Sequence, residues 1–297
     1  MTDITAGPIT APAPVQGKGY WRLVGERILR DKVTLVVAAV LVTIVLIAIF
    51  APLVTSYDPY TGKIGNRLQP IGTPGHWLGT DEVGRDLWTR LAYGARLSLL
   101  TGVTPVFFAT LIGGTLGIVA GIGGRIPNTI IMRTMDVFYA FPSVLLAIAI
   151  CGVLGAGLFN TMLSLTIVFI PPLVRVSESL TTQVRSLDFV EAARATGASL
   201  AMVIRHQVIA NVLSPILVYA TSLVSISIIL AAGLSFLGLG VAPPAAEWGA
   251  MLNALRQSIY VNPVNAALPG FVILATSMSF NLISDGLRSA MDVRLPR

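Results

Sequence analysis

Long apolar runs alternate with short polar segments along the whole chain. Five runs contain no Asp, Glu, Lys or Arg: residues 33–57, 97–124, 137–174, 207–246 and 257–284. Each is longer than the roughly 20 apolar residues that a helix needs to cross a bilayer. The third run can hold one helix and most of another, because Gly152, Gly155 and Gly157 predict a turn inside it. The pattern therefore predicts an all-α membrane protein with six transmembrane helices.

The polar stretches divide the chain into segments. Residues 1–19, rich in Pro, Ala, Thr and Gly, are predicted to be a disordered tail, and residues 20–32 an amphipathic helix at the membrane interface. After them we expect a first transmembrane helix at 33–54, an outer loop at 55–96, a five-helix core at 97–288 that includes a polar loop at 186–211, and a tail at 289–297. The core helices are expected at about 97–122, 128–152, 158–174, 212–233 and 267–284. A signal peptide is the alternative for the N-terminus, but the apolar run is long and has no clear cleavage site.

The basic residues are distributed unevenly between the two sides of this topology. The chain is 54% hydrophobic and 11% charged, with a formal net charge of +6. If the N-terminus is inside, fourteen of the twenty Lys and Arg residues lie in inner segments: Lys18, Arg22, Arg27, Arg30, Lys32, Arg125, Arg133, Arg175, Arg185, Arg194, Arg205, Arg288, Arg294 and Arg297. Because Lys and Arg favour the cytoplasmic side, we expect a multi-pass protein of the inner (plasma) membrane with both termini and the loop at 186–211 in the cytoplasm. This distribution indicates membrane lipid, and not nucleic acid, as the partner of the positive charge.

The loop at 186–211 has the pattern of two short helices separated by a glycine. Asp188 is predicted to cap the first helix, with Glu191 three residues on, as in a capping box. Gly197 can adopt the left-handed conformation that ends a helix, and Ser199 can cap the next one. The alternative is a basic loop between two spans that binds nothing.

A resemblance favours a specific role for this loop. Glu191-Ala192-Ala193, Gly197 and the later Val208-Ile209 and Asn211 resemble the EAA loop of ABC importer permeases, which docks into a groove on the ATPase subunit. The resemblance implies that the ATPase-coupling residues are Glu191, Ala192, Ala193, Gly197 and His206. The family pattern ends in Leu-Pro, where this chain has Ile209-Ala210.

Four further stretches resemble the second permease of dipeptide and oligopeptide ABC importers. They are LGTDEVGRD at 78–86 with YGARLS at 93–98, Asp136 with Ala140-Phe141-Pro142, LSFLGLGVAPP at 234–244 with Trp248-Gly249 and Met251, and NLISDGLR at 281–288 with Asp292 and Arg294. The first stretch supplies the outer-loop family motif, Gly79, Thr80, Asp81, Gly84, Arg85 and Asp86. These residues could also simply build turns and caps, and Trp248 is expected to anchor its loop rather than to touch substrate.

Several kinds of chemistry are not supported by the sequence. There is no phosphate loop of the Gly-x-x-x-x-Gly-Lys-Ser/Thr type, so the chain is not expected to bind ATP. The topology puts His76 and His206 on opposite sides of the membrane, and Cys151 is the single cysteine. We therefore expect no catalytic residues, no metal site and no cofactor. Arg133 and Asp136 are expected to form a structural salt bridge near the inner end of the third span.

The resemblance implies a permease subunit of a type I ABC importer of peptides, without an ATPase site of its own. The expected partners are a related permease that completes a heterodimer, two cytoplasmic ATP-binding subunits or domains, and an extracytoplasmic substrate-binding protein. Similar permeases import nickel chelates, glutathione, opines or oligosaccharides, so the substrate stays open. An ion-coupled secondary transporter is the alternative of another class, but the spans lack the series of buried carboxylates that proton coupling would use.

Overall fold

The computed structural model describes residues 20–291, and within this range every regular element is a helix. The predicted tail at 1–19 and residues 292–297 lie outside the described part. Five helices are long and apolar enough to cross a membrane: α2 (Lys32–Ile49), α4 (Leu87–Ile122), α7 (Leu158–Arg185), the stretch Leu200–Phe236 that ends in α10 (Ala210–Phe236), and α12 (Pro263–Met291). A sixth span results if the bent pair α5 (Arg125–Tyr139) and α6 (Ser143–Leu154) crosses as one. The all-α membrane architecture is confirmed.

Shorter helices connect and flank these spans. The stretch predicted to be an amphipathic helix is α1 (Tyr20–Arg30), and α3 (Ala51–Val54) follows the first span. The remaining elements are η1 (Ile64–Asn66), α8 (Asp188–Ala195), α9 (Leu200–Val203), the π-helical turn η2 (Ile204–Ile209), α11 (Trp248–Leu255) and the 3-10 helix η3 (Arg256–Tyr260). Asp31 caps α2, and the hydroxyl of Thr34, which donates to its carboxylate, lowers the pKa of Asp31 below its ordinary value.

Two segment boundaries need correction. Helix α4 begins at Leu87, ten residues before the predicted start, so the loop expected at 55–96 ends at Asp86. The two arginines at the start of this helix, Arg90 and Arg96, donate to backbone carbonyls. At the other end of the chain, α12 continues to Met291, beyond the expected start of the tail at 289.

The third span is broken, and the prediction of one continuous helix at 128–152 is wrong. Helices α5 and α6 meet at an angle of 85° across Ala140-Phe141-Pro142. Proline has no backbone N–H, and it disfavours helical geometry in the residue before it. The charge-free run begins at Val137 and continues across Pro142, so the pattern of charges gives no sign of the break.

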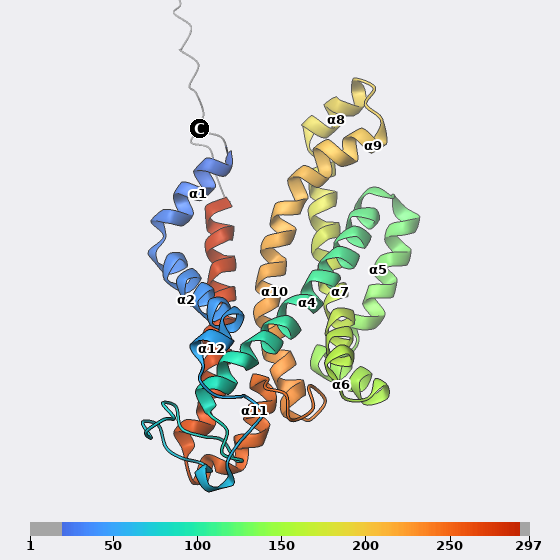
Figure 1. The fold of residues 1–297 in the computed structure, drawn as a ribbon. Coiled ribbons are helices and arrows are strands. Elements are labelled where there is room, and N and C mark those ends of the chain that lie inside the picture. Colours follow the sequence, from blue (N-terminus) through green and yellow to red (C-terminus); the bar gives the residue numbers. More distant parts are fainter. Residues whose placement is uncertain (1–19, 292–297) are drawn as a thin grey trace, which may run out of the picture.

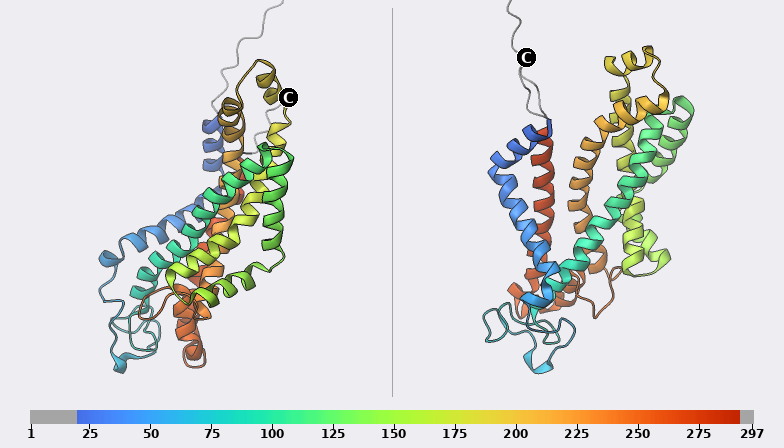
Figure 2. Two further views of the ribbon diagram at one scale, coloured as in Figure 1. Left: turned by 90° about the vertical axis from the view of Figure 1, so that its right-hand side faces the viewer. Right: turned by 45° about the horizontal axis from the view of Figure 1, so that its top comes forward.

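The helices place the polar loops at two opposite ends of the molecule (Figure 1). Helices α1, α8 and α9, the turn between α4 and α5, and the end of α12 lie at one end, and the 55–86 loop, α6 and α11 lie toward the other. Two further views show that α2 lies beside α12, while α4 runs obliquely along α7 (Figure 2). The loop at 186–211 is therefore far from the loop at 55–86.

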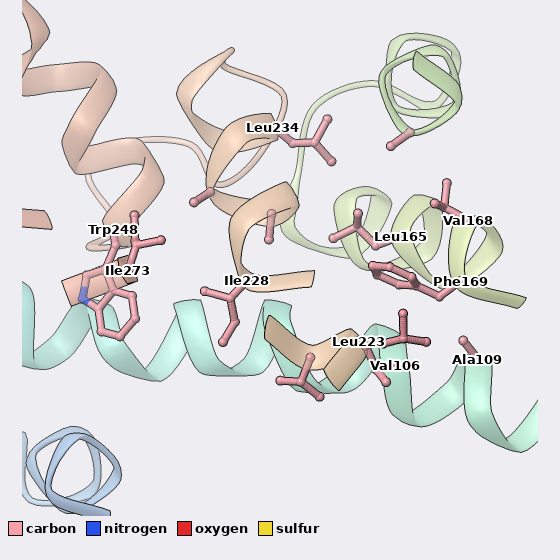
Figure 3. Close-up of a cluster of buried hydrophobic side chains, with 14 of the residues drawn as sticks. Val106, Ala109, Leu165, Val168, Phe169, Leu223, Ile228, Leu234, Trp248 and Ile273 are labelled. Atoms are coloured by element: carbon pink, nitrogen blue, oxygen red, sulfur yellow. The ribbon is translucent and has the colours of Figure 1, made fainter. Parts of the chain in front are cut away.

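The core forms where α4, α7 and α10 pack together (Figure 3). Val106 and Ala109 of α4 lie near Phe169 of α7, and Leu223 and Ile228 come from α10. Glycines allow α4 and α7 to approach closely, since a Cβ at Gly113 would meet the Leu173 side chain at 2.9 Å, and one at Gly117 would meet Val174 and Ser177. This packing holds the spans that carry both polar loops.

Candidate functional site

The loop at 186–211 begins with a helix whose start differs from the prediction. The carbonyl of Leu187 accepts hydrogen bonds from the N–H groups of Val190 (2.9 Å) and Glu191 (3.4 Å), so Leu187 occupies the cap position. Asp188 is the first residue of α8 and does not precede it, so the predicted capping box is wrong. Both acids still lie in the first turn, where the helix dipole favours negative charge.

The break between α8 and α9 follows the prediction. Gly197 has φ +86°, which is left-handed backbone. The N–H of Ala198 donates to the carbonyl of Ala193 (3.1 Å), the bond that defines a Schellman ending. Ser199 then caps α9, and its hydroxyl accepts from the N–H of Met202 at 3.3 Å. These bonds set the direction of α9 relative to α8.

The exposed surface of this loop combines acids with apolar side chains. Val190 in α8 and Val203 in α9 are buried. The exposed residues include Leu187, Asp188, Phe189, Glu191, Ala192, Leu200 and Met202. Apolar side chains exposed together, at the tip of a protruding loop, are typical of a protein interaction site.

Ala193 and His206, the other two residues predicted to couple to the ATPase with Glu191, Ala192 and Gly197, are not part of the exposed surface just described. Ala193 is only partly exposed, and its carbonyl is used by the helix ending described above. His206 is exposed in the π-helical turn η2, where its Nδ1 lies 3.2 Å from the carbonyl oxygen of Met202. The sequence analysis missed this π-helical turn, which stands at the exit of the loop where the family pattern has Leu-Pro.

The 55–86 loop is organised around two buried carboxylates. Asp81 accepts from the backbone N–H of Val83 (3.0 Å) and Arg85 (2.9 Å), and its other oxygen lies 2.6 Å from Arg85 Nε and 3.3 Å from Arg90 Nε. Asp86 caps α4 through Thr89 and lies 2.9 Å from His76 Nδ1. Charged groups are stable in such buried positions only when they are paired and hydrogen-bonded in this way.

The other motif residues fix the backbone of the same loop. Gly79 and Gly84 have φ +75° and +82°, and a Cβ at either position would collide with a backbone carbonyl oxygen. Thr80 donates to the carbonyl of Asn66 and accepts from the N–H of Gln69 (2.9 Å). The structure thus brings all six motif residues together, in bonds that stay within the protein.

A neighbouring carboxylate, which the sequence analysis missed, joins this end of the molecule. Glu247 is buried, caps α11 through Gly249 and Ala250, and accepts from the Ser98 hydroxyl at 3.2 Å. Trp248 beside it is fully buried and donates from Nε1 to the carbonyl of Leu91 at 3.0 Å. The expectation that Trp248 anchors its loop is confirmed. Arg90, which pairs with Asp81 of the 55–86 loop, also donates to the carbonyl of Pro244 (3.3 Å). It therefore connects that loop to the segment before α11.

Comparison with known proteins agrees with this architecture. The family described as "Binding-protein-dependent transport system inner membrane component" matches residues 113–296, and "N-terminal TM domain of oligopeptide transport permease C" matches residues 19–70. The dipeptide transport system permease protein DppC of Alkalihalophilus pseudofirmus is 42% identical, covering 93% of this chain and 90% of its own length. The glutathione transport system permease protein GsiD of Pectobacterium atrosepticum is 38% identical, with coverage of 93% and 91%.

A solved structure shares the fold. An inward-facing MetNI methionine ABC transporter contains a chain that matches with a TM-score of 0.56 at 19% identity, covering 68% of this chain and 96% of its own. The family matches, the two relatives and the membrane-spanning fold all agree. This chain belongs to the inner-membrane components of binding-protein-dependent transport systems, and it is a permease of an ABC importer.

Proposed function

We propose that this chain is one of two permease subunits in an importer of peptides, and that its loop at 186–211 receives the ATPase. The observation that carries the proposal is the exposed, direction-fixed pair α8–α9 at one end of a permease whose full-length relatives include peptide permeases. A related permease completes the path across the membrane. The partner subunits bind and hydrolyse ATP, since the sequence of this chain contains no phosphate loop.

The exposed residues of α8 and α9 suit a groove on another protein. Glu191 can pair with a basic residue of the partner, and Phe189 and Met202 can make apolar contacts. The short side chain of Ala192 allows the partner to approach the helix backbone closely. The Schellman ending at Gly197 fixes how α9 leaves the docked helix, and α9 continues through η2 into α10. A movement of the ATPase surface would therefore be transmitted to a membrane span.

We infer that the end that carries α8 is cytoplasmic. The Lys and Arg bias of the sequence supports this orientation, and it leaves the 55–86 loop and α11 on the outside. A substrate-binding protein would then deliver its ligand over a surface whose loops are fixed by buried ion pairs. Cysteine labelling of intact cells should reach positions near Gly75 and Pro244 but not Ser199→Cys, and external labelling of Ser199→Cys would overturn the orientation.

The test of the function uses a complete complex in proteoliposomes. The chain is purified with its genetically linked permease, ATPases and binding protein, and uptake of radiolabelled Ala-Ala, Ala-Ala-Ala and glutathione is measured with ATP inside. We expect ATP-dependent uptake of at least one alanine peptide. Uptake of glutathione alone would restrict the substrate to that class, and uptake driven by an ion gradient without ATP would contradict an importer of this kind.

The docking site is tested by co-purification. Phe189→Glu should reduce the amount of ATPase that co-purifies with the tagged permease pair, because it places a charge in the apolar part of the surface. Phe159→Glu is a matched control, since Phe159 is exposed on α7 near the opposite end of the molecule. Equal recovery of ATPase with both variants would contradict the docking site.

A further inference from the structure

A charged cluster lies on the exposed surface of α5 and α7. Asp136 of α5 lies 2.6 Å from Arg175 of α7 and 3.5 Å from Arg133 one turn away. The guanidinium of Arg175 also lies over the ring of Tyr139, 4.2 Å from its centroid. The sequence predicted the pair Arg133–Asp136, but the shorter contact joins two spans. We call these four residues the α5–α7 cluster.

On the proposed topology, the cluster lies in the inner half of the membrane-spanning helices. Arg175 is seventeen residues from the start of α7 and ten from its end, which places it about 26 Å and 15 Å from the two ends. Asp136 is eleven residues from the start of α5, or about 16 Å along the helix. Helix α7 has 28 residues and is about 42 Å long, which exceeds the hydrocarbon core of about 30 Å, so a position about 26 Å from its outer end lies in the inner half of the bilayer.

The side chains of the cluster are nevertheless accessible on this subunit. The exposed fractions are 45% for Arg175 and 41% for Asp136. A charged side chain in contact with lipid is costly, so ionisable residues within spans face a bundle interior or a water-filled cavity. The surface that carries this cluster is thus turned away from lipid in the assembled transporter.

Helix α5 presents a second, different surface. Arg133, Asp136 and Tyr139 are spaced three apart and share one face of the helix. Ile126, Ile130 and Val137 are also exposed, and at 100° per residue they are centred about 100° from Asp136, with Arg133 between Asp136 and this apolar set. Asp136 and Tyr139 therefore lie on a different side of α5 from its exposed apolar residues.

A hollow of about 210 Å³ adjoins the cluster at the elbow between α5 and α6. Tyr139 lines it together with Phe141 and with Pro171 and Pro172, which precede Arg175 on α7. A side chain of a passing solute could therefore enter the hollow while a charged group of the same solute remains beside Arg175.

We propose that the α5–α7 cluster lines the translocation path and binds the carboxylate of a passing peptide. Two guanidinium groups face one carboxylate, so the cluster carries an excess positive charge. Arg175 has five N–H donors, and the contact with Asp136 engages one of its terminal nitrogens. Arg133 and Arg175 can thus pair with a carboxylate through charge-assisted bonds. This inference rests on the proposed function, because it names the peptide group that the path would contact.

Labelling decides whether the cluster faces the path. In the complete complex, reconstituted in nanodiscs with this chain in a Cys151→Ala background, Tyr139→Cys and Asp136→Cys are exposed to a charged, membrane-impermeant thiol reagent. Both should react at least about tenfold faster than the control Val137→Cys, because the reagent needs a hydrated thiolate. Equal, slow reaction at all three positions would overturn the inference and indicate a face buried in lipid or against the partner permease.

Uptake decides whether the cluster binds a carboxylate. The wild-type complex, Arg175→Gln and the control Arg125→Gln are compared for uptake of Ala-Ala-Ala and of its C-terminal amide, with one binding protein throughout. Loss of a charge-assisted bond should reduce the ratio of acid to amide uptake roughly tenfold in Arg175→Gln only. An unchanged ratio would overturn the carboxylate contact. Failure of the wild-type complex to take up either peptide would overturn the proposed function instead, while the labelling result still decides whether the cluster lines the path.

Discussion

The loops at 55–86 and 186–211 differ in how they use their polar residues. In the 55–86 loop, Asp81 and Asp86 are buried, and their oxygens are occupied by backbone N–H groups, arginines and a histidine. In the 186–211 loop, Asp188 and Glu191 are exposed, and the buried side chains of the two short helices are those of Val190 and Val203. The charges of the 55–86 loop are paired within the protein, whereas the exposed acids of the 186–211 loop are available to a partner protein.

This difference assigns different roles to two motifs that look alike in the sequence. Both resemble stretches of the same family and both contain glycines and acids at fixed spacing. The internal bonds of Asp81 and Asp86 support a scaffold role, because a partner could reach them only by displacing arginines or cap hydrogen bonds. The exposed Glu191 and Phe189 support a docking role. Substitutions should therefore destabilise the protein in the first loop and uncouple it in the second.

The largest expected effect is at Asp81. Asp81→Ala leaves the guanidinium groups of Arg85 and Arg90 without their shared carboxylate in a buried site, which should cost about 3–5 kcal/mol of folding free energy. The thermal unfolding midpoint of the purified complex in detergent measures the loss. Glu82→Gln is the control, because Glu82 is a more exposed partner of Arg85. An Asp81→Ala protein as stable as the Glu82→Gln protein would contradict the scaffold role of Asp81.

A smaller loss is expected at Glu247. Glu247→Ala removes the cap of α11 and leaves the Gly249 and Ala250 N–H groups without their acceptor, at a cost of about 2–3 kcal/mol. The same melting experiment should show a lower midpoint. Asn253→Ala, on the same helix but at a less buried position, should change it little. Equal midpoints for the two variants would mean that α11 does not depend on its cap.

At Gly197 the expected change is in coupling more than in stability. A β-branched residue in left-handed backbone costs about 1–2 kcal/mol, so Gly197→Val should redirect α9 and abolish transport while the protein still inserts in the membrane. Asn tolerates this conformation, so Gly197→Asn should keep most of the transport rate. A β-carbon at Gly197 would meet no other atom, so a difference between the variants reports backbone direction and not a clash. Equal transport by both would mean that the break is unimportant.

The smallest effect belongs to Ser199. Ser199→Ala removes the hydroxyl that accepts from the Met202 N–H and should destabilise α9 locally by about 1 kcal/mol. Faster hydrogen exchange of the α9 amides, with the rest of the protein unchanged, is the expected measurement. Ser199→Asp should restore the protection, since Asp is an equally good cap. Exchange rates in Ser199→Ala equal to the wild type would show that packing alone holds α9.

Much of this architecture could be predicted from the sequence. Charge-free runs located the spans, because a bilayer requires long apolar helices, and the pattern around Gly197 and Ser199 predicted the helix break correctly. Local rules failed where distant residues decide. The start of α4 carries a local signal that was overlooked, the Asp86 cap on Thr89, whereas Arg90 also bonds to the carbonyls of Pro59 and Pro244, and Asp136 pairs across spans with Arg175. Such partners are far away in sequence, so no spacing rule could indicate them.

The central claim is that the 186–211 loop is a surface for the ATPase, and substrate-stimulated ATP hydrolysis tests it most directly. The rate is measured in the complete reconstituted complex with Glu191→Lys, and with Arg125→Glu as a charge reversal at the same end of the molecule but outside the loop. We predict that Glu191→Lys reaches the membrane in normal amounts and unfolds at the wild-type temperature, yet loses stimulation by substrate, while Arg125→Glu keeps it. Wild-type stimulation in Glu191→Lys would contradict the account.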